Sequence, residues 1–377
     1  MFERSQQAFM KQERAYWLAW SQIAGIGSIS LYKIYQHFGS LKAAWTAKAI
    51  AFKDIDGLGN KVINAIQLRR STIDPEALLA NHQLQNPQFW TPADLAYPRL
   101  LLETPSPPSL LYYLGKVEPA ENKGTKPMIG IVGTRNPTEY GKRWTKKVTQ
   151  ALVNHGFGIV SGMAAGIDTV AHCSCLEASG RTIAVLGTGV DTVYPHSNRH
   201  LYSQLKTQGL IVSEYPAGTT PDRGHFPARN RIIAGLCRAV IIMEAPQRSG
   251  ALITARFANE FGRDVYVLPG SLDRKQAIGC LKLISSGAQV ILGIEHLLEM
   301  LGTMPCLDRL PTIEEPSLNL QPELERIYRL IDRDSVSLDT IVQETGQNTG
   351  SILAALSQLE ILDLIVQLPG MRYQIKN

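Results

Sequence analysis

The stretch IVGTRNPTEYGKR, residues 131–143, passes from an apolar run into a polar turn, which is typical of a strand followed by a helix in a nucleotide-binding fold. A dinucleotide site would have Gly-x-Gly-x-x-Gly here, and a P-loop would have Gly-x4-Gly-Lys-Ser/Thr. Neither pattern is present, because Gly133 is followed by Thr134 and Arg135, and Lys142 comes too late in the stretch. The stretch therefore indicates a strand, a turn and a helix, and it leaves open which phosphate the turn would bind.

Seven apolar runs between residues 128 and 301 are separated, with few exceptions, by amphipathic stretches of helix length. The runs are MIGIVG, FGIVSG, RTIAVLG, LIVSEY, RAVIIMEA, DVYVLPG and QVILG. Near-continuous Val and Ile indicate strands that are buried on both faces of a parallel sheet. The pattern predicts an α/β domain with a Rossmann-like, doubly wound and mostly parallel sheet.

Residues 1–72 have the pattern of a helical domain of the helix-hairpin-helix or SAM-like kind. Two similar phrases, IAGIGSISLYKIYQHF at 23–38 and IDGLGNKVINAIQLRR at 55–70, each place Gly-apolar-Gly before an amphipathic helix. Such a glycine turn can offer backbone N–H groups to a nucleic-acid phosphate. A small helical module that docks another protein is the alternative, and both interpretations stay open.

The other segments are connectors and a C-terminal domain. A proline-rich lead-in at 73–127 looks like a connector, and its phrase SLLYYLG is expected to add an edge strand to the Rossmann-like domain, residues 73–302. A linker at 303–322 leads into 323–377, where three short helices and a two-stranded wing predict a winged-helix-like domain. The third of these helices contains no Lys or Arg, so the pattern fits protein contact or regulation as well as DNA binding.

The composition indicates a folded protein with a small positive charge. The 377 residues suit two or three domains, and a net charge of +5 favours an anionic partner only where basic residues cluster. The five cysteines form no Cys-x-x-Cys pair, which argues against disulfides or zinc and for a reducing compartment. Because the N-terminus is polar and no apolar run approaches the ~20 residues that span a bilayer, we expect a cytoplasmic protein with no membrane partner.

The loops beyond the carboxyl ends of the strands are where an open parallel sheet binds its ligands. In the first loop, Arg135 precedes Asn136, which we expect to cap the next helix, with Glu139 completing a capping box. In the second loop, SGMAAGID at 161–168, small residues permit either close approach of an anionic ligand or tight packing of helix on sheet. The third loop, GTGVDTVYPHSNRH at 187–200, adds a tyrosine and basic side chains.

The fourth loop, SEYPAGTTPDRGHFPARNRIIAGL at 213–236, is the most informative of the set. It places Arg229 and Arg231 near a helix N-terminus, where cations oppose the helix dipole by ~0.3–1 kcal/mol each unless an anion is bound. Pairing of these arginines with carboxylates such as Glu214 or Asp222 is the alternative. The fifth loop contains a further arginine before a serine that is a natural N-cap.

The strand-end loops together therefore supply at least five arginines, accompanied by aromatic residues: Arg135, Arg199, Arg229, Arg231 and Arg248. A chain of phosphates requires that many cations, and aromatic rings stack on unpaired bases for ~1–3 kcal/mol each. No Gly-x-Ser-x-Gly, His-Glu-x-x-His or carboxylate cluster with metal-ligand spacing occurs. Asp168 and His172, four residues apart, fit a structural pair better than a catalytic one. We predict binding to a nucleic-acid backbone, without catalytic or metal-binding residues.

Seven phrases in this order resemble the DNA-processing protein A family, also called DprA or Smf: IVGTRNPTEYG, VSGMAAGIDTVAH, GRTIAVLGTGVDTVYP, SEYPAGTTP, FPARNRIIAGL, SGALITA and GRDVYVLPG. The resemblance covers residues 90–292. It implies a non-enzymatic homodimer without a cofactor that binds single-stranded DNA. It further implies that the protein shields incoming DNA and loads RecA recombinase onto it during natural transformation.

Carried over residue by residue, the resemblance assigns Arg135 to the DNA-binding Gly-Ser-Arg loop, although Thr134 replaces the serine. It assigns Arg229 and Arg231 to the Phe-Pro-x-Arg-Asn-Arg motif, and residue 199 or 200 to a basic position after the Tyr-Pro turn. The residues expected to contact DNA are Gly133, Thr134, Arg135, Gly162, Gly166, Arg199, His200, Phe226, Arg229, Asn230, Arg231, Arg248, Ser249 and Gly250.

Two other functions remain as alternatives. A Rossmann-like nucleotide hydrolase similar to the cytokinin-activating, lysine-decarboxylase-like family would carry Pro-Gly-Gly-x-Gly-Thr-x-x-Glu, and the nearest phrases here are PGS at 269–271 and SGALIT at 249–254. A ligand-sensing transcription factor would recognise duplex DNA with its winged helix. The lack of basic residues in the third helix disfavours that function.

Overall fold

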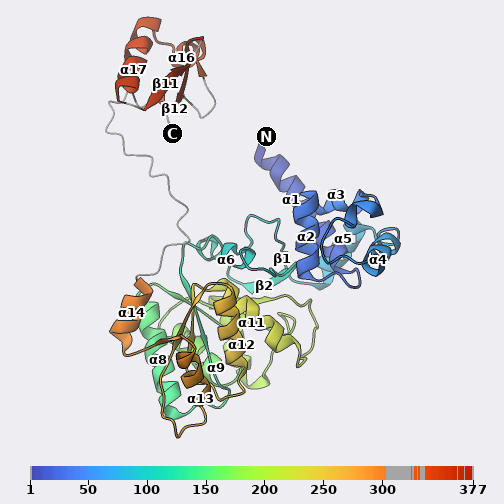
Figure 1. Cartoon of the computed structure of the whole chain (residues 1–377), viewed down its shortest axis with the longest axis vertical. Helices are drawn as coiled ribbons and strands as arrows, with labels where there is room; N and C mark the ends of the chain where they lie inside the picture. Colours follow the sequence, from blue (N-terminus) through green and yellow to red (C-terminus); the bar gives the residue numbers. More distant parts are fainter. Residues whose placement is uncertain are drawn as a thin grey trace. The chain divides into compact units, whose positions relative to one another are not determined.

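The computed structural model describes residues 2–302, 324, 327–328, 330–331, 336–362, 364–368 and 370–375. The chain divides into two compact units, residues 1–308 and 309–377 (Figure 1). The predicted linker at 303–322 lies outside the described residues, and the predicted domain boundaries remain predictions. Among the described residues, none forms a helix that is both long and apolar enough to cross a membrane, and none belongs to a cluster of three or more metal-ligating side chains.

A nine-stranded sheet forms the centre of the first unit, with the strand order β1-β2-β6-β5-β4-β3-β7-β8-β9. The strands are β1 (Phe89–Trp90), β2 (Leu111–Gly115), β3 (Met128–Val132), β4 (Gly158–Ser161), β5 (Thr182–Val185), β6 (Leu210–Ser213), β7 (Ala239–Ile242), β8 (Asp264–Val267) and β9 (Gln289–Val290). Strands β3 to β9 pair in parallel, whereas β2 is antiparallel to β6 and β1 to β2. The predicted doubly wound sheet is confirmed, and each of the seven apolar runs contains one of its strands.

Helices cover both faces of this sheet, which is why its central strands are apolar on both faces. One face packs against α8 (Glu139–Asn154), α9 (Ile167–Glu177) and α14 (Ile294–Gly302). The other face packs against α6 (Arg99–Leu102), α11 (His225–Leu236), α12 (Gly250–Glu260) and α13 (Ile278–Ser285) (Figure 1). Two short elements, α7 (Pro119–Asn122) and η2 (His196–Asn198), and the helix α10 (Arg199–Gln208) complete the α/β part.

The N-terminal helices form a separate bundle whose core joins that of α10. They are α1 (Phe2–Ser21), α2 (Ser28–Phe38), α3 (Leu41–Thr46), η1 (Ala49–Phe52), α4 (Asn60–Arg70) and α5 (Pro75–Gln85). Gly27 and Gly59 are the N-caps of α2 and α4, so each predicted glycine turn does precede a helix. Trp20 is fully buried in this core, and its indole N–H donates to the carbonyl of Leu41.

The interpretation of the proline-rich lead-in as a connector is wrong for residues 75–85, which form α5 and pack against α1. Pro75 occupies the first turn, where its missing N–H costs nothing, and the side chain of Asp74 accepts from the amides of Glu76 and Ala77. The phrase SLLYYLG does extend the sheet as β2, although β1 takes the outermost position.

The described residues of the second unit include a three-stranded sheet in the order β10-β12-β11 and the helices α16 and α17. The elements are β10 (Val336–Ser337), α16 (Leu338–Thr345), α17 (Thr349–Ile361), β11 (Ile365–Leu368) and β12 (Arg372–Ile375). The first predicted helix of this domain is described only in part, and Leu324, Ile327 and Tyr328 within it are helical. The strands β11 and β12 form the predicted wing.

Candidate nucleic-acid interface

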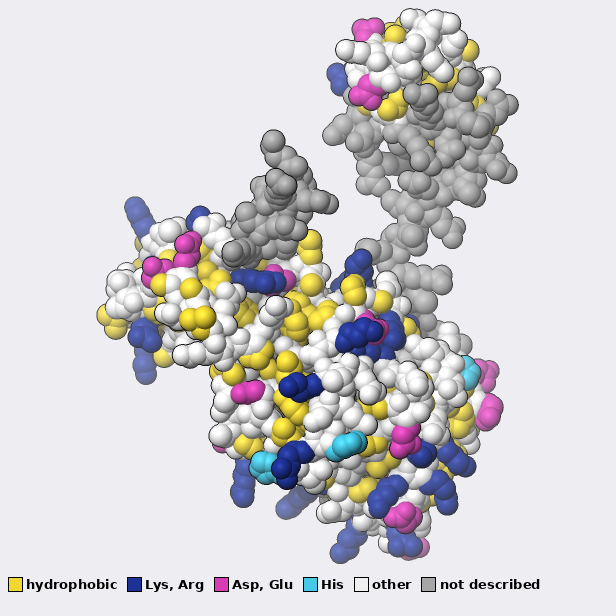
Figure 2. Space-filling model, turned by 180° about the vertical axis from the view of Figure 1, so that it is seen from behind, with side chains coloured by type: hydrophobic (Ala, Val, Ile, Leu, Met, Phe, Trp, Pro, Cys, Tyr) yellow, Lys and Arg dark blue, Asp and Glu magenta, His cyan; other side chains and the backbone are white. Residues whose placement is uncertain are grey.

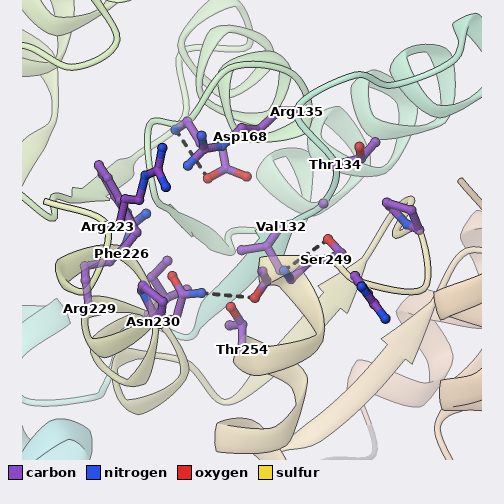
Figure 3. Close-up of a pocket in the computed structure, with 18 of the residues that line it drawn as sticks. Val132, Thr134, Arg135, Asp168, Arg223, Phe226, Arg229, Asn230, Ser249 and Thr254 are labelled. Atoms are coloured by element: carbon purple, nitrogen blue, oxygen red, sulfur yellow. Dashed lines mark hydrogen bonds between the residues drawn. The ribbon is translucent and has the colours of Figure 1, made fainter. Parts of the chain in front are cut away.

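A cavity of about 640 Å³ opens at the carboxyl ends of β3, β4 and β7. Strand β3 is the point at which the chain order of the sheet reverses, because β4 lies on one side of it and β7 on the other, and open α/β sheets bind ligands at such a point. Figure 3 shows Arg223 and Phe226 on one side of this strand-end cavity and Thr134 and Ser249 on the other.

The glycines of the first two loops serve close backbone packing. The amide of Ile167 donates to the carbonyl of Thr134 over 3.1 Å, which brings the start of α9 against the β3–α8 loop. Gly166 has a φ of +85°, and a Cβ there would overlap this same carbonyl. The tight-packing interpretation of residues 161–168 therefore fits the observed contacts.

The predicted N-cap of α8, Asn136, is two residues too early. The helix begins at Glu139, and its N-cap is Thr138, whose hydroxyl accepts from the amide of Gly141 at 3.2 Å. The amide and hydroxyl of Thr138 donate to the buried carboxylate of Glu244 over 2.8 and 2.6 Å. This carboxylate comes from the end of β7 and holds Thr138 in an extended conformation, which local sequence could not indicate. The predicted cap residue Asn136 instead donates its backbone amide to the Thr134 hydroxyl.

An exposed cation and two aromatic rings meet at the strand-end cavity. The guanidinium of Arg135 lies 5.6 Å from the centre of the Phe226 ring, and Phe226 lies 5.4 Å from Tyr194. A Cβ at Gly187 would approach the Phe226 ring to 2.9 Å, so this glycine makes room for the ring. Half-exposed rings beside a guanidinium suit a stacked base next to a phosphate.

Two further exposed arginines, Arg223 and Arg248, line the same cavity. Arg248 was among the predicted residues, and it precedes the N-cap Ser249, whose hydroxyl accepts from the amide of Ala251. Arg223 was missed. Arg223 lies in the fourth loop, in the turn just before α11, and this position could have indicated that it belongs to the site.

Arg229 differs from these residues because it is buried, with 4% of its surface exposed. Its Nη1 donates to the carbonyl of Gly162 at 2.7 Å and to that of Val185, joining the ends of β4 and β5. Burial lowers the pKa of Arg229 to about 10, although the nearby Asp168 carboxylate opposes this shift. A Cβ at Gly162 would overlap the guanidinium. The geometry favours a structural part for Arg229 over direct contact with phosphate.

The other residues of the fourth loop also make internal contacts. The Nη2 of Arg231 lies 2.6 Å from the Oε2 of Glu214, and both side chains are about 15% exposed. The pairing considered as an alternative is therefore what the structure contains. The side-chain amide of Asn230 donates to the carbonyl of Gly250 and ties α11 to α12 (Figure 3).

The predicted basic residues of the third loop, Arg199 and His200, lie outside the lining of the strand-end cavity. Both are exposed at the start of α10. Asn198, just before them, is buried and donates to the carbonyl of Met163 and to the Thr169 hydroxyl. The structure thus places the start of this helix against the second loop without bringing either basic residue into the cavity.

Asp168 and His172 each contact a different partner. The Asp168 carboxylate accepts from the amides of Gly162 and Ala164 at 3.1 and 3.4 Å, and burial raises its pKa although Arg229 opposes the shift. The Nδ1 of His172 lies 2.7 Å from the Thr182 hydroxyl, and burial, with a smaller effect of the Arg229 charge, lowers the pKa of His172 to about 3. These contacts are structural, but they are made with other residues, so the structure does not contain the expected pairing of Asp168 with His172.

The arrangement suits an anion that carries aromatic rings. Among the described residues that line the strand-end cavity, Asp168 is the one carboxylate, and its contacts are with backbone amides. Exposed guanidinium groups and ring faces provide electrostatic attraction and stacking, and neither group transfers protons at neutral pH.

Known proteins share this organisation. The family model described as DNA recombination-mediator protein A matches residues 88–302, and a model described as the DprA winged helix domain matches residues 311–371. The protein Smf of Synechocystis sp. is 51% identical over 96% of this chain and 98% of its own length. The DNA processing protein DprA of Streptococcus pneumoniae is 42% identical over 63% of this chain and 81% of its own.

Two solved structures are similar to this one. The X-ray structure of DprA from Streptococcus pneumoniae has a TM-score of 0.67 and 36% identity, covering 76% of this chain and 97% of its own. A structure of DNA processing protein A from Helicobacter pylori, solved in work on its single-stranded DNA binding mode, has a TM-score of 0.51 and 32% identity. It covers 57% of this chain and 96% of its own.

Proposed function

This chain belongs to the DNA recombination-mediator protein A family, and on that premise we propose that it binds single-stranded DNA at the strand-end cavity. The observation that carries the proposal is the group formed by Arg135, Phe226 and Tyr194, with Arg223 and Arg248 beside it. The Helicobacter pylori relative was solved in work on its single-stranded DNA binding mode, which supports the same ligand here.

The chemistry of this group favours unpaired nucleotides over a duplex. Arginine attracts every phosphate, whereas a ring face stacks only on a base that is not already stacked in a helix. Phe226 and Tyr194 present such faces next to the Arg135 guanidinium. A single strand can therefore use both kinds of contact, whereas a duplex uses the cations alone.

We further propose that the protein acts by binding rather than by catalysis, and that it protects incoming DNA during natural transformation. In this proposal a homodimer delivers the bound strand to RecA recombinase. The names of the Streptococcus pneumoniae and Bacillus subtilis relatives, both DNA processing proteins, support a DNA-processing role. We expect RecA filaments to form faster on single-stranded DNA when the protein is present. An unchanged rate of filament formation would contradict delivery to RecA.

Fluorescence anisotropy with a labelled oligonucleotide, single-stranded and duplex, over a salt series tests the binding site. Three exposed arginines that neutralise three phosphates of a single strand give a log–log salt slope of about −2. Arg135→Ala is expected to weaken single-strand binding and to make the slope shallower by about 0.7. The matched control is Arg256→Ala, which removes an exposed arginine on α12 that pairs with Glu260 outside the cavity.

Three outcomes decide the proposal. Preference for single strands, with loss in Arg135→Ala but not in the control, supports it. A slope near zero, or equal losses in both variants, contradicts it. Tighter binding to a specific duplex assigns the protein to the ligand-sensing transcription factors instead.

A further inference from the structure

A second cavity, of about 710 Å³, lies on the other side of the β3–α8 loop. We propose that it binds the next nucleotides of the same DNA strand that occupies the strand-end cavity. This inference rests on the proposed function and specifies the path of the strand over the protein.

The same two loops form walls of both cavities. In the β3–α8 loop, Thr134 and Arg135 line the strand-end cavity, and Thr138 lines the second cavity. In the β7–α12 loop, Arg248 lines the strand-end cavity, whereas Glu244 lines the second. The bonds from Thr138 to the Glu244 carboxylate join the two loops into one ridge. A strand that leaves the first cavity over this ridge enters the second.

The second cavity offers a ring for a base. Tyr140 is 36% exposed, and its hydroxyl donates to the carbonyl of Pro269 over 3.0 Å, which fixes the ring in place. The buried apolar side chains of Met243, Leu268 and Ala277 form other parts of the lining. An ordered aromatic ring in an apolar hollow is the environment in which an unpaired base stacks.

Cations accompany this ring. The guanidinium of Arg143 lies 6.0 Å from the centre of the Tyr140 ring, and the exposed Arg274 lines the cavity from the β8–α13 loop. Of the two carboxylates in the lining, Glu244 is buried and accepts from Thr138, whereas Glu139 is exposed and pairs with Lys142 at 2.8 Å. Phosphates on either side of a base on Tyr140 would therefore be within reach of two guanidinium groups, and the negative charge of Glu139 is offset by its pairing with Lys142.

A second pair of an aromatic ring and a cation follows Tyr140 and Arg143 along α8. Trp144 lies 6.3 Å from Tyr140, and the ammonium of Lys147 lies 5.5 Å from the Trp144 ring. The repetition of a ring with a cation one turn further along the helix gives a direction for the strand beyond the second cavity.

Cross-linking tests the path directly in the unmodified full chain. A single-stranded oligonucleotide of about 16 nucleotides, long enough for more than one cavity, carries one 5-iodouracil at successive positions, and mass spectrometry locates each photoproduct. We expect cross-links to Phe226 or Tyr194 from one set of positions and to Tyr140 from another set, several nucleotides away. Absence of a Tyr140 product at every position, with Phe226 or Tyr194 products present, would overturn the inference while leaving the proposed function intact.

Binding measurements with two lengths give an independent readout. The double variant Tyr140→Leu/Arg274→Ala is expected to weaken binding of the long oligonucleotide by about tenfold or more, since one stacking contact is worth ~1–3 kcal/mol. An oligonucleotide of about 5 nucleotides should lose no more than about twofold, because it fits within one cavity, whereas Arg135→Ala should weaken both lengths. Arg256→Ala serves again as the control.

An equal loss for both lengths in the double variant, or no loss for either, contradicts the inference. Free thymidine monophosphate serves as a competitor at the same concentration as the long oligonucleotide. If it displaces the oligonucleotide, the second cavity is assigned to small nucleotides, and this result also contradicts the inference. If wild-type protein binds neither length, the proposed function fails, and this inference fails with it.

Discussion

The arginines at the strand ends occupy two chemically different environments. Arg135 is exposed and its charge is close to an aromatic ring, so a phosphate can approach it from solvent. Arg229 is enclosed, and its guanidinium donates to backbone carbonyls at the ends of two strands. A buried cation is stabilising only while its partners are present, and removal of one partner leaves a buried polar group unpaired.

The first prediction follows from this difference. Arg229→Ala is expected to lower the free energy of unfolding by about 3–5 kcal/mol, because it unpairs the carbonyl of Gly162 and leaves the Asp168 charge without its neighbouring cation. Arg135→Ala is expected to change it by no more than about 0.5 kcal/mol. Urea unfolding of both variants measures the effect. A stable Arg229→Ala protein that had lost only DNA affinity would assign Arg229 to phosphate binding.

The second prediction concerns the pH dependence of stability. The pKa of buried His172 is about 3 in the folded protein against 6.5 in the unfolded chain, so between these values the unfolded chain binds more protons. Lowering the pH through this window therefore favours unfolding, with a contribution that approaches about 1.4 kcal/mol per pH unit. Urea unfolding at several pH values below neutrality measures the effect. The free energy of unfolding should fall less steeply with decreasing pH in His172→Gln than in wild type. The same pH dependence of the free energy of unfolding in both proteins would contradict the low pKa of His172.

At the scale of elements, the strand-to-helix loops are held by contacts between loops rather than by local capping alone. The N-cap of α8 accepts from its own helix and also donates to a carboxylate at the end of β7. This contact fixes the start of α8 and therefore the conformation of the preceding loop, which contains Arg135. The ridge between the two cavities depends on the same contact.

The third prediction separates the observed cap from the expected one. Thr138→Ala should lower the free energy of unfolding by about 1–2 kcal/mol, because the amide of Gly141 loses its acceptor and the Glu244 carboxylate loses a donor. Asn136→Ala should change it by about 0.5 kcal/mol or less. Guanidinium unfolding compares the two variants. A larger effect at Asn136 would restore the capping box that the local pattern predicted.

At the scale of the whole molecule, each unit has a core of its own. The second unit is centred on Ile341, Leu356 and Tyr373, and the cores of the first unit are made of other residues. Figure 2 shows that Lys and Arg side chains on one face of the described protein lie in separate groups, with acidic side chains among them. On this face the positive charge is therefore spread out, and strong DNA contact requires local groups such as those at the strand ends.

The fourth prediction is that the first unit suffices for the proposed binding. A protein of residues 1–308 should bind single-stranded DNA within about twofold of the full chain and with the same salt slope, since effects of independent units are additive. The predicted recognition helix α17 contains no Lys or Arg, which agrees with this expectation. Anisotropy titrations of both proteins make the comparison. A loss of about tenfold or more would place DNA contacts in the second unit.

The sequence by itself determined the strands, the sheet class and the loops that carry the site. Runs such as those at β3 and β7 are composed of β-branched and other apolar residues, and only a strand covered on both faces uses such a run throughout. Because strand ends in a parallel sheet meet at one edge, the loop containing Arg135 could be assigned to the site from its position alone.

The tertiary structure decided what each side chain in those loops contacts. Arg229 and Arg231 are two residues apart in one helix, yet one is enclosed by strand-end carbonyls and the other pairs with Glu214 from the loop after β6. Phe226 meets Tyr194 from a different loop, and the cap of α8 depends on Glu244 from the loop after β7. Periodicity encodes burial and local conformation, whereas these partners are distant in sequence. The order of strands in the sheet and the packing of helices over it bring them together.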